Sequence, residues 1–275
     1  MCPRLCRVDR SKTLGFCGER NKIRIAKVIH NFMWEEPYIT LKNGTCAIFF
    51  SGCNLKCSFC QNYKISRGGI GKSYSINQFV NLLKEIDSGS DETIDLITPT
   101  HFSYYILKAL KIYRPKKKII YNTSGYENEK IIKKLAKYVD IFLPDFKYFD
   151  SALSKKYSNC EDYFAISSKV IKLMTKLKPN IFKNGNLEQG VIIRHLILPD
   201  QTKDSLAILQ YIKDNVKDPI ISLMSQYTPS GEKKEGRKLL NLEYKVVLNK
   251  AKKLGLNKGF FQDMSASDEN FIPEF

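Results

Sequence analysis

The chain of 275 residues is predicted to fold as an α/β domain whose parallel strands form part of a barrel. From residue 46 onward, strand-like runs alternate with helical patterns, as is typical of βα units. The strand-like runs are rich in Ile, Leu, Val and Phe with little alternation, which indicates strands buried on both faces. Six such strands are too few for a complete eight-stranded barrel, so we expect a partial, TIM-like (β/α)6 barrel.

The individual elements follow from the same patterns. We expect strands at 45–50, 93–98, 118–122, 140–145, 190–198 and 219–226. We expect helices at 76–87, 102–113, 127–138, 161–178, 203–216 and 241–254, and a candidate strand at 259–264. Ser75 and Gln78 have the spacing of a capping box for the first of these helices. The chain is thus divided into a cysteine-bearing N-terminal extension (1–44), the barrel (45–230) and a C-terminal helix and tail (231–275).

Composition and charge indicate where the protein is located and which partners it binds. No apolar segment approaches the roughly 18 to 20 residues needed to cross a bilayer, and the N-terminus MCPRLCRVDR lacks the apolar region of a signal peptide. We therefore expect a cytoplasmic protein without membrane association. The net charge of +17 favours association with nucleic acid. The lysines are spread over nearly every predicted helix, however, so we do not expect nucleic acid as the main substrate.

Three of the eight cysteines form the motif Cys53-x3-Cys57-x2-Cys60 directly after the first predicted strand. Closely spaced cysteines in a reducing cytosol are more often metal ligands than disulfides. A structural zinc site takes four protein ligands, and no fourth cysteine or histidine lies within reach of this short loop. Thiolates also suit iron–sulfur clusters, and three of them leave one iron of a four-iron cluster open for chemistry. The isolated Cys46 and Cys160 are expected to pack as small hydrophobic residues.

Polar segments follow the other predicted strands. In parallel α/β architectures the carboxyl ends of the strands meet at one edge, where the chemistry is located. The segments at this edge are TPTH (98–101), YNTSGYE (121–127), PDFKYFD (144–150), RHLILPD (194–200) and SQYTP (225–229).

The cysteine loop, with Phe59 before Cys60, resembles the loop of the radical S-adenosylmethionine (SAM) superfamily. Longer segments resemble the PflX family, relatives of the pyruvate formate-lyase activating enzyme, over roughly residues 2 to 250. The segments are FFSGCNLKCSFCQNYKIS, DLITPTHF, IIYNTSGYE, VDIFLPDFKYFD, IIRHLILPD, MSQYTP, CPRLCRVDR and GFCG. The resemblance implies a [4Fe-4S] cluster on Cys53, Cys57 and Cys60. It also implies that SAM binds the open iron and is cleaved by one electron to methionine and a hydrogen-abstracting 5′-deoxyadenosyl radical.

The resemblance also implies residues that bind SAM. Many radical SAM proteins place Gly-Gly-Glu after the second strand, whereas this chain, like the PflX family, has TPTH there. Thr98, Thr100 and His101 are therefore candidates to bond the amino group of SAM. A TP dipeptide at a strand end is also a common strand terminator.

In the activating enzymes, Asp-Thr after the third strand and Asp-Leu-Lys after the fourth lie beside the carboxylate of SAM. The matching residues here are Asn122, Thr123, Asp145 and Lys147. Asp145 and the Thr123 hydroxyl are candidates for a monovalent cation site, although Asn122 stands where the relatives carry a carboxylate. Arg194 matches a strand arginine of those enzymes.

His195 follows Arg194 on the same strand, and adjacent strand residues point to opposite faces. We expect Arg194 to reach the cofactor and His195 to form a structural hydrogen bond.

The N-terminal extension carries Cys2, Cys6 and Cys17, which are candidates for a zinc ion or an auxiliary cluster with a fourth ligand from elsewhere. The same extension holds the family-like segment at residues 34–37, to which the sequence assigns no role.

The leading hypothesis is a radical SAM enzyme that abstracts hydrogen from a protein or peptide, as a glycyl-radical activase does, with flavodoxin or ferredoxin as electron donor. Two alternatives stay open: a radical SAM enzyme that modifies RNA or a small molecule, and a non-catalytic iron–sulfur or metal module.

Overall fold

The computed structural model describes residues 2–229, 236–264 and 275. Ten strands in these residues belong to one sheet. They are β1 (Ile23–Phe32), β2 (Thr45–Phe50), β3 (Lys72–Tyr74), β4 (Thr93–Ile97), β5 (Lys118–Thr123), β6 (Ile141–Pro144), β7 (Ile181–Lys183), β8 (Asn186–Leu196), β9 (Ile220–Met224) and β10 (Gly259–Phe261). Their order in space is β10-β9-β8-β6-β5-β4-β2-β1-β3, and β7 pairs with β8.

The sheet is parallel from β2 to β10 along this order, and only β1, β3 and β7 pair antiparallel. It ends at β3 on one side and β10 on the other, so it is open. The predicted fold class, a mostly parallel sheet with alternating helices that falls short of a closed barrel, is confirmed. The six strands expected from the sequence are β2, β4, β5, β6, β8 and β9, and their interiors are buried on both faces.

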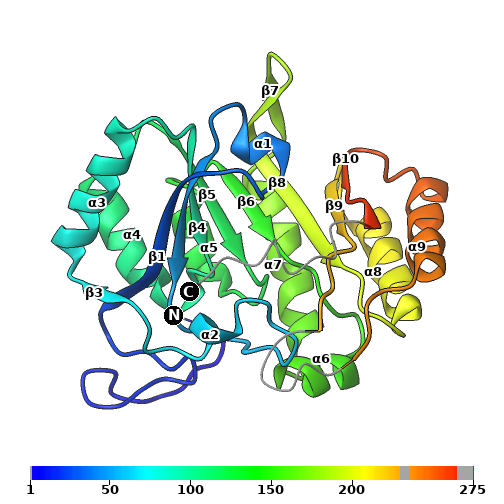
Figure 1. Cartoon of the computed structure of the whole chain (residues 1–275), viewed down its shortest axis with the longest axis horizontal. Helices are drawn as coiled ribbons and strands as arrows, with labels where there is room; N and C mark the ends of the chain where they lie inside the picture. The colour runs from blue at the N-terminus through cyan, green and yellow to red at the C-terminus, as the bar shows by residue number, and fades with distance from the viewer. Residues whose placement is uncertain (1, 230–235, 265–274) are drawn as a thin grey trace.

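Most of the helices follow the parallel strands and cover the outside of the sheet, whereas the short helix Pro37–Thr40 packs against its interior face. The helices are α1 (Pro37–Thr40), α2 (Tyr63–Ser66), α3 (Ile76–Ser88), α4 (Ser103–Ile112), α5 (Glu129–Leu135), α6 (Ser151–Ser158), α7 (Tyr163–Leu177), α8 (Thr202–Asn215) and α9 (Asn241–Lys253), with a 3₁₀ turn at Thr100–Phe102. Figure 1 shows α3 and α4 at one end of the molecule and α8 and α9 at the other. None of the described helices is long and apolar enough to cross a membrane.

The start of α3 carries the expected capping box. The Ser75 hydroxyl accepts from the Gln78 amide at 3.2 Å, and the Gln78 side chain accepts from the Ser75 amide at 2.8 Å. Helix α6 was not expected, although its ends carry helix signals. Asp150 accepts from the Ala152 amide at 2.7 Å at the N-terminus, and Asn159 takes a left-handed conformation after the last turn.

The segment expected as an N-terminal extension contributes to the sheet. Strand β1 lies within residues 1–44 and pairs antiparallel with β2, with Ile25 opposite Phe50. The short helix α1 follows it, and its fully buried Ile39 joins a cluster with inward-facing residues of the parallel strands, among them Ile120 and Ile192. Residues 33–40 therefore lie against the interior of the open barrel.

Candidate active site

A cavity of about 400 Å³ opens at the carboxyl ends of the parallel strands. This volume lies in the range of small-molecule sites. The cavity brings together ten of the twelve residues that the sequence assigned to the cluster and SAM. They are Cys53, Cys57, Phe59, Cys60, Thr98, Asn122, Thr123, Asp145, Lys147 and Arg194.

The cysteine loop begins where β2 ends, and its first turn leaves no space for a side chain. Gly52 has a φ of +81°, and a Cβ there would lie 2.5 Å from the Cys17 carbonyl oxygen. Cys53 and Cys57 are buried. The Leu55 amide donates to Cys53 Sγ at 3.3 Å, and the Ser158 hydroxyl donates to Cys57 Sγ at 3.0 Å. Backbone and hydroxyl donors thus already point at two of the three sulfur atoms.

The three thiols suit a cluster better than a single ion. Burial raises the pKa of Cys53 and raises that of Cys60 to about 12, so both thiols stay protonated until a metal displaces the protons. A tetrahedral zinc ion with bonds of about 2.3 Å needs ligand atoms about 4 Å apart. Among the described residues, the three cysteines do not lie within 4.8 Å of one another as a set. Wider spacing fits a [4Fe-4S] cluster, in which each cysteine binds a different iron.

A charged network lies beside the cysteines in the same cavity. Arg194 donates from Nε to Asp145 Oδ1 at 3.0 Å, from Nη1 to Glu35 at 3.1 Å, and from Nη2 to the Asn122 side chain. Lys147 Nζ lies 2.7 Å from Asp145 Oδ2. Burial opposes ionisation of Asp145, but the two cations outweigh it and hold its pKa below the usual value. Asp145 and Lys147 are therefore ionised at neutral pH, whereas burial raises the pKa of Glu35 well above its usual value. The pair offers a lysine ammonium to an anionic group.

Thr123 and Thr100 donate hydrogen bonds to Glu127, an acid that was not among the site residues predicted from the sequence. Glu127 Oε1 accepts from Thr100 Oγ1 at 2.5 Å, from Thr123 Oγ1 at 2.7 Å and from the Tyr121 hydroxyl at 3.2 Å. Burial raises the pKa of Glu127 to about 7. Thr100 does not line the cavity, since its side chain faces Glu127. Glu127 ends the segment YNTSGYE, but its spacing alone does not distinguish it from a solvated helix-start residue.

The two buried histidines hold backbone carbonyls and lie outside the cavity lining. His101 Nε2 donates to the Ser51 carbonyl at 2.6 Å, directly before the cysteine loop. His195 Nδ1 donates to the Phe146 carbonyl at 2.7 Å, while Arg194 faces the cavity. Burial lowers the pKa of His101 to about 3 and that of His195 to about 4, so both rings are neutral. In this structure both histidines position backbone segments.

Thr98 lines the cavity in a strained conformation. Its φ of +60° lies in the left-handed region, which is unusual for a β-branched residue. Its amide donates to the Asn122 carbonyl at 2.9 Å. Strain of this kind is often concentrated at binding sites.

The N-terminal segment packs on the cysteine loop. The Cys53 amide donates to the Cys17 carbonyl at 3.3 Å, and Arg4 Nε donates to the Asn54 carbonyl at 2.8 Å. Cys17 is buried, Cys2 is half-buried and Cys6 is exposed. In the described part of the chain these three thiols do not form a set within 4.8 Å of one another.

Two acids in the cavity wall come from the segment to which the sequence gave no role. Glu35 and Glu36 lie between β1 and α1 and line the cavity beside Trp34. A pair of glutamates before a short helix is ordinary in a surface loop, so only the packing of residues 33–40 against the barrel interior identifies them.

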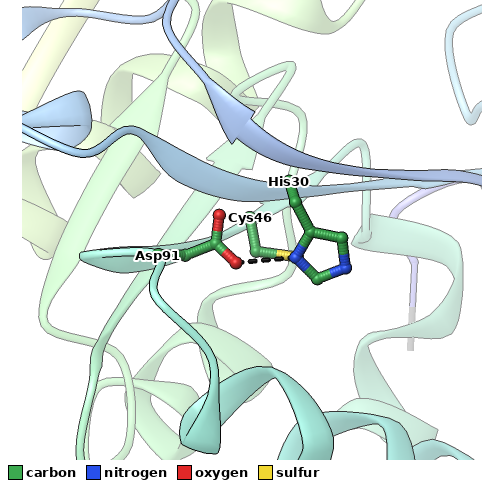
Figure 2. Close-up of side chains that lie close together, drawn as sticks. All are labelled: His30, Cys46 and Asp91. Atoms are coloured by element: carbon green, nitrogen blue, oxygen red, sulfur yellow. Dashed lines mark hydrogen bonds and ion pairs between the residues drawn. The ribbon is translucent and has the colours of Figure 1, made fainter.

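A separate group of possible metal ligands lies at the amino ends of the strands, away from the cavity. His30, Cys46 and Asp91 offer ligand atoms within 4.8 Å of one another, and Figure 2 shows them side by side. His30 Nδ1 and Asp91 Oδ2 are 2.7 Å apart, and Asp91 Oδ1 accepts from the Asn31 amide at 2.7 Å. Asp91 therefore ties β1 to the start of β4.

Three cysteines after the first parallel strand, open to a cavity at the carboxyl ends of the sheet, define an α/β protein suited to an iron–sulfur cluster. The chain belongs to the Radical SAM superfamily, whose family model matches residues 47–212. A [4Fe-4S] cluster and SAM are the cofactors of this superfamily, whose members are generally enzymes.

Sequence and structure comparisons find similar proteins over most of the chain. The "Uncharacterized protein MJ0674" of Methanocaldococcus jannaschii is 26% identical over 273 residues, which cover 93% of this chain and 75% of that protein. SuiB of Streptococcus suis bound to S-adenosylmethionine superposes with a TM-score of 0.51 at 13% identity, over 81% of this chain and 49% of SuiB.

Two further structures show the same fold. SuiB bound to the precursor peptide SuiA gives a TM-score of 0.52 at 14% identity, over 76% of this chain and 46% of SuiB. Methylornithine synthase (PylB) gives 0.50 at 15% identity, over 81% of this chain and 62% of PylB. The chain therefore spans about half the length of SuiB and less than two thirds of PylB.

Proposed function

We propose that this protein cleaves SAM reductively at a [4Fe-4S] cluster and removes a hydrogen atom from a protein or peptide substrate, as a glycyl-radical activase does. One observation carries the proposal: the thiols of the cysteine loop open into the same cavity as the network of Asp145, Lys147 and Arg194. When bound, the cluster and SAM supply the one-electron cleavage of a carbon–sulfur bond that generates the abstracting radical.

The residues of the chain have distinct roles in this proposal. Cys53, Cys57 and Cys60 hold the cluster. Lys147 binds the carboxylate of SAM as a compact charge, and Asp145 fixes the direction of its ammonium. Phe59, which packs against the ring of Tyr227 at 5.8 Å, forms an apolar wall that limits access of water. Thr98 offers its hydroxyl to the amino group of SAM.

Two features of the surroundings support a macromolecular substrate. The cavity opens at the carboxyl ends of the strands, where a loop of the substrate can reach it. SuiB, which shares this fold over 46% of its chain, has been solved bound to the precursor peptide SuiA. The electron would come from a one-electron donor such as flavodoxin or ferredoxin.

Two cofactor assignments stay predictions within this proposal. A monovalent cation at Asp145 and Thr123 would have to share Asp145 with Lys147 and Arg194, which already bond both of its oxygens. A zinc ion or auxiliary cluster at Cys2, Cys6 and Cys17 would need their side chains to converge. The second assignment is tested by comparing the metal content per chain of the wild type with that of a variant that lacks all three N-terminal cysteines.

The central test measures 5′-deoxyadenosine after anaerobic reconstitution, reduction with dithionite and addition of SAM. We expect the wild type and Cys160→Ser to form the nucleoside and Cys57→Ala to form none. Cys160 is a matched control because it is a buried cysteine outside the cavity. Absence of the nucleoside in the wild type would exclude radical SAM chemistry and favour a non-catalytic metal module.

The activase role needs a second experiment. Reduced enzyme is incubated with SAM and a candidate glycyl-radical enzyme, and the mixture is frozen for electron paramagnetic resonance. A protein-centred radical that depends on Cys57 is expected. Nucleoside formation without any protein radical, across a panel of glycyl-radical enzymes and peptides, would exclude the activase role and keep the radical chemistry.

A further inference from the structure

We propose that the floor of the cavity binds a cationic nitrogen group of the substrate at Glu36, with the fully buried Asp95 behind the cavity wall. In a peptide this group is the ammonium of lysine or the guanidinium of arginine. The inference rests on the proposed function in one respect, that the occupant of the cavity is the substrate of the radical reaction.

The floor is built by the segment between β1 and α1. Glu35 and Glu36 line the cavity, and α1 directly after them packs its buried Ile39 into the apolar cluster of the barrel interior. Asp95 lies in the middle of β4 and is fully buried. It is connected to the cavity wall through Asn122, whose Nδ2 donates to Asp95 Oδ2 at 3.1 Å.

The cations of the described cavity lining are already engaged by two other carboxylates. Asp145 accepts from Lys147 at 2.7 Å and from Arg194 at 3.0 Å. Glu35 accepts from Arg194 at 3.1 Å. Arg194 and Lys147 therefore form their ion pairs with these two acids, although burial raises the pKa of Glu35.

Glu36 and Asp95 interact with the charge of Arg194 only without direct contact. Neither forms an ion pair within the described residues, and Glu36 Oε2 and Asp95 Oδ1 are buried without a hydrogen-bond partner. Glu36 is only 8% exposed. An unpaired buried carboxylate costs several kcal/mol, so the arrangement fits a site whose positive charge arrives with the ligand. Burial raises the pKa of Asp95 to about 7, even though the Asn122 hydrogen bond and the charge of Arg194 act to lower it.

The geometry favours an organic cation over a metal ion. The acids of the floor do not bring three ligand atoms within 4.8 Å of one another in the part of the chain that is described. An ammonium group carries three donors and can bridge oxygens that are farther apart than the ligands of one ion. Trp34 and Phe32, whose rings lie 5.2 Å apart, line the same cavity and offer aromatic surface to a cation or its aliphatic chain.

The experiment measures binding of a small amine to the reconstituted protein. Radiolabelled 1,5-diaminopentane is dialysed to equilibrium against the holoenzyme, with and without saturating SAM and with excess 1,5-pentanediol as a neutral competitor. Trp34 is the single tryptophan of the chain, so its emission reports occupancy of the cavity independently of turnover. The variants are Glu36→Gln, Asp95→Asn and the control Glu161→Gln, an exposed glutamate outside the cavity.

We expect saturable binding of the diamine that changes Trp34 emission, resists the diol and persists with SAM bound. Glu36→Gln and Asp95→Asn should each weaken binding at least tenfold, and Glu161→Gln should not. Equal affinity in all variants, displacement by the diol, or absence of binding would overturn the inference. Competition by SAM would also overturn it, because the acids would then belong to the amino group of the cofactor.

The 5′-deoxyadenosine assay separates the two proposals. Nucleoside formation by a wild type that does not bind the diamine leaves the proposed function standing and removes only the cationic site. Charge-selective binding in a protein that forms no nucleoside supports the site and rejects the radical function.

Discussion

Replacing Arg194 with leucine should lower the free energy of unfolding by about 3 to 5 kcal/mol, because the change leaves the largely buried Glu35 without its cation and Asp145 with Lys147 alone. Arg194 bonds Asp145 at 3.0 Å and Glu35 at 3.1 Å. The three side chains are only 13%, 19% and 12% exposed, so little solvent screens the charges. Asn122 also loses the donor to its side-chain oxygen.

Urea unfolding followed by circular dichroism measures the effect, with the midpoint and slope fitted for each variant. Lys258→Met is the control, since Lys258 and Asp218 form a pair whose side chains are 43% and 57% exposed. An exposed pair of this kind contributes about 0 to 1 kcal/mol.

The double variant Arg194→Leu/Glu35→Gln should recover part of the loss, because it removes one of the stranded charges. A loss from Arg194→Leu no larger than that from Lys258→Met would refute the reasoning that this network is buried and mutually dependent.

Three further predictions concern the surroundings of the site. Tyr163→Phe should lower the free energy of unfolding by about 1 to 3 kcal/mol and raise the KM for SAM. The reason is that the Tyr163 hydroxyl lies 2.9 Å from the Asp145 carbonyl and 2.8 Å from the Ser124 carbonyl and donates to them. An unchanged KM would contradict this. Ser75→Ala should lower the unfolding free energy by about 1 kcal/mol through loss of the helix cap, with the far-ultraviolet spectrum preserved. Burial lowers the pKa of His195 to about 4, whereas in the unfolded chain this pKa is about 6.5. The contribution of His195 to stability is therefore fully present above a pH of about 6.5. This contribution is lost as the pH falls from about 6.5 to 4, because only the unfolded chain takes up the proton. His195→Gln should therefore show a shallower loss of stability over that window, and identical slopes would refute the assignment.

The sequence predicted the elements that depend on local pattern. The apolar runs of β2, β4, β5 and β6 reflect burial on both faces, which the residues display without reference to any neighbour. The cap at Ser75 also depends on residues three positions apart. The antiparallel strands β1, β3 and β7 were missed, because their residues are mixed in polarity and their pairing is decided by distant segments.

The cysteine motif alone indicated the chemistry that this protein is suited to, because three thiols within eight positions of one loop face the same cavity. Which other groups surround them depended on the tertiary structure. His101 and Thr98 lie three residues apart, yet the first bonds the Ser51 carbonyl and the second lines the cavity. Glu36 reaches the cavity floor only because α1 packs inside the barrel. Local spacing fixes a short loop, whereas the direction of a side chain at the end of a strand depends on how separate segments pack around a shared interior.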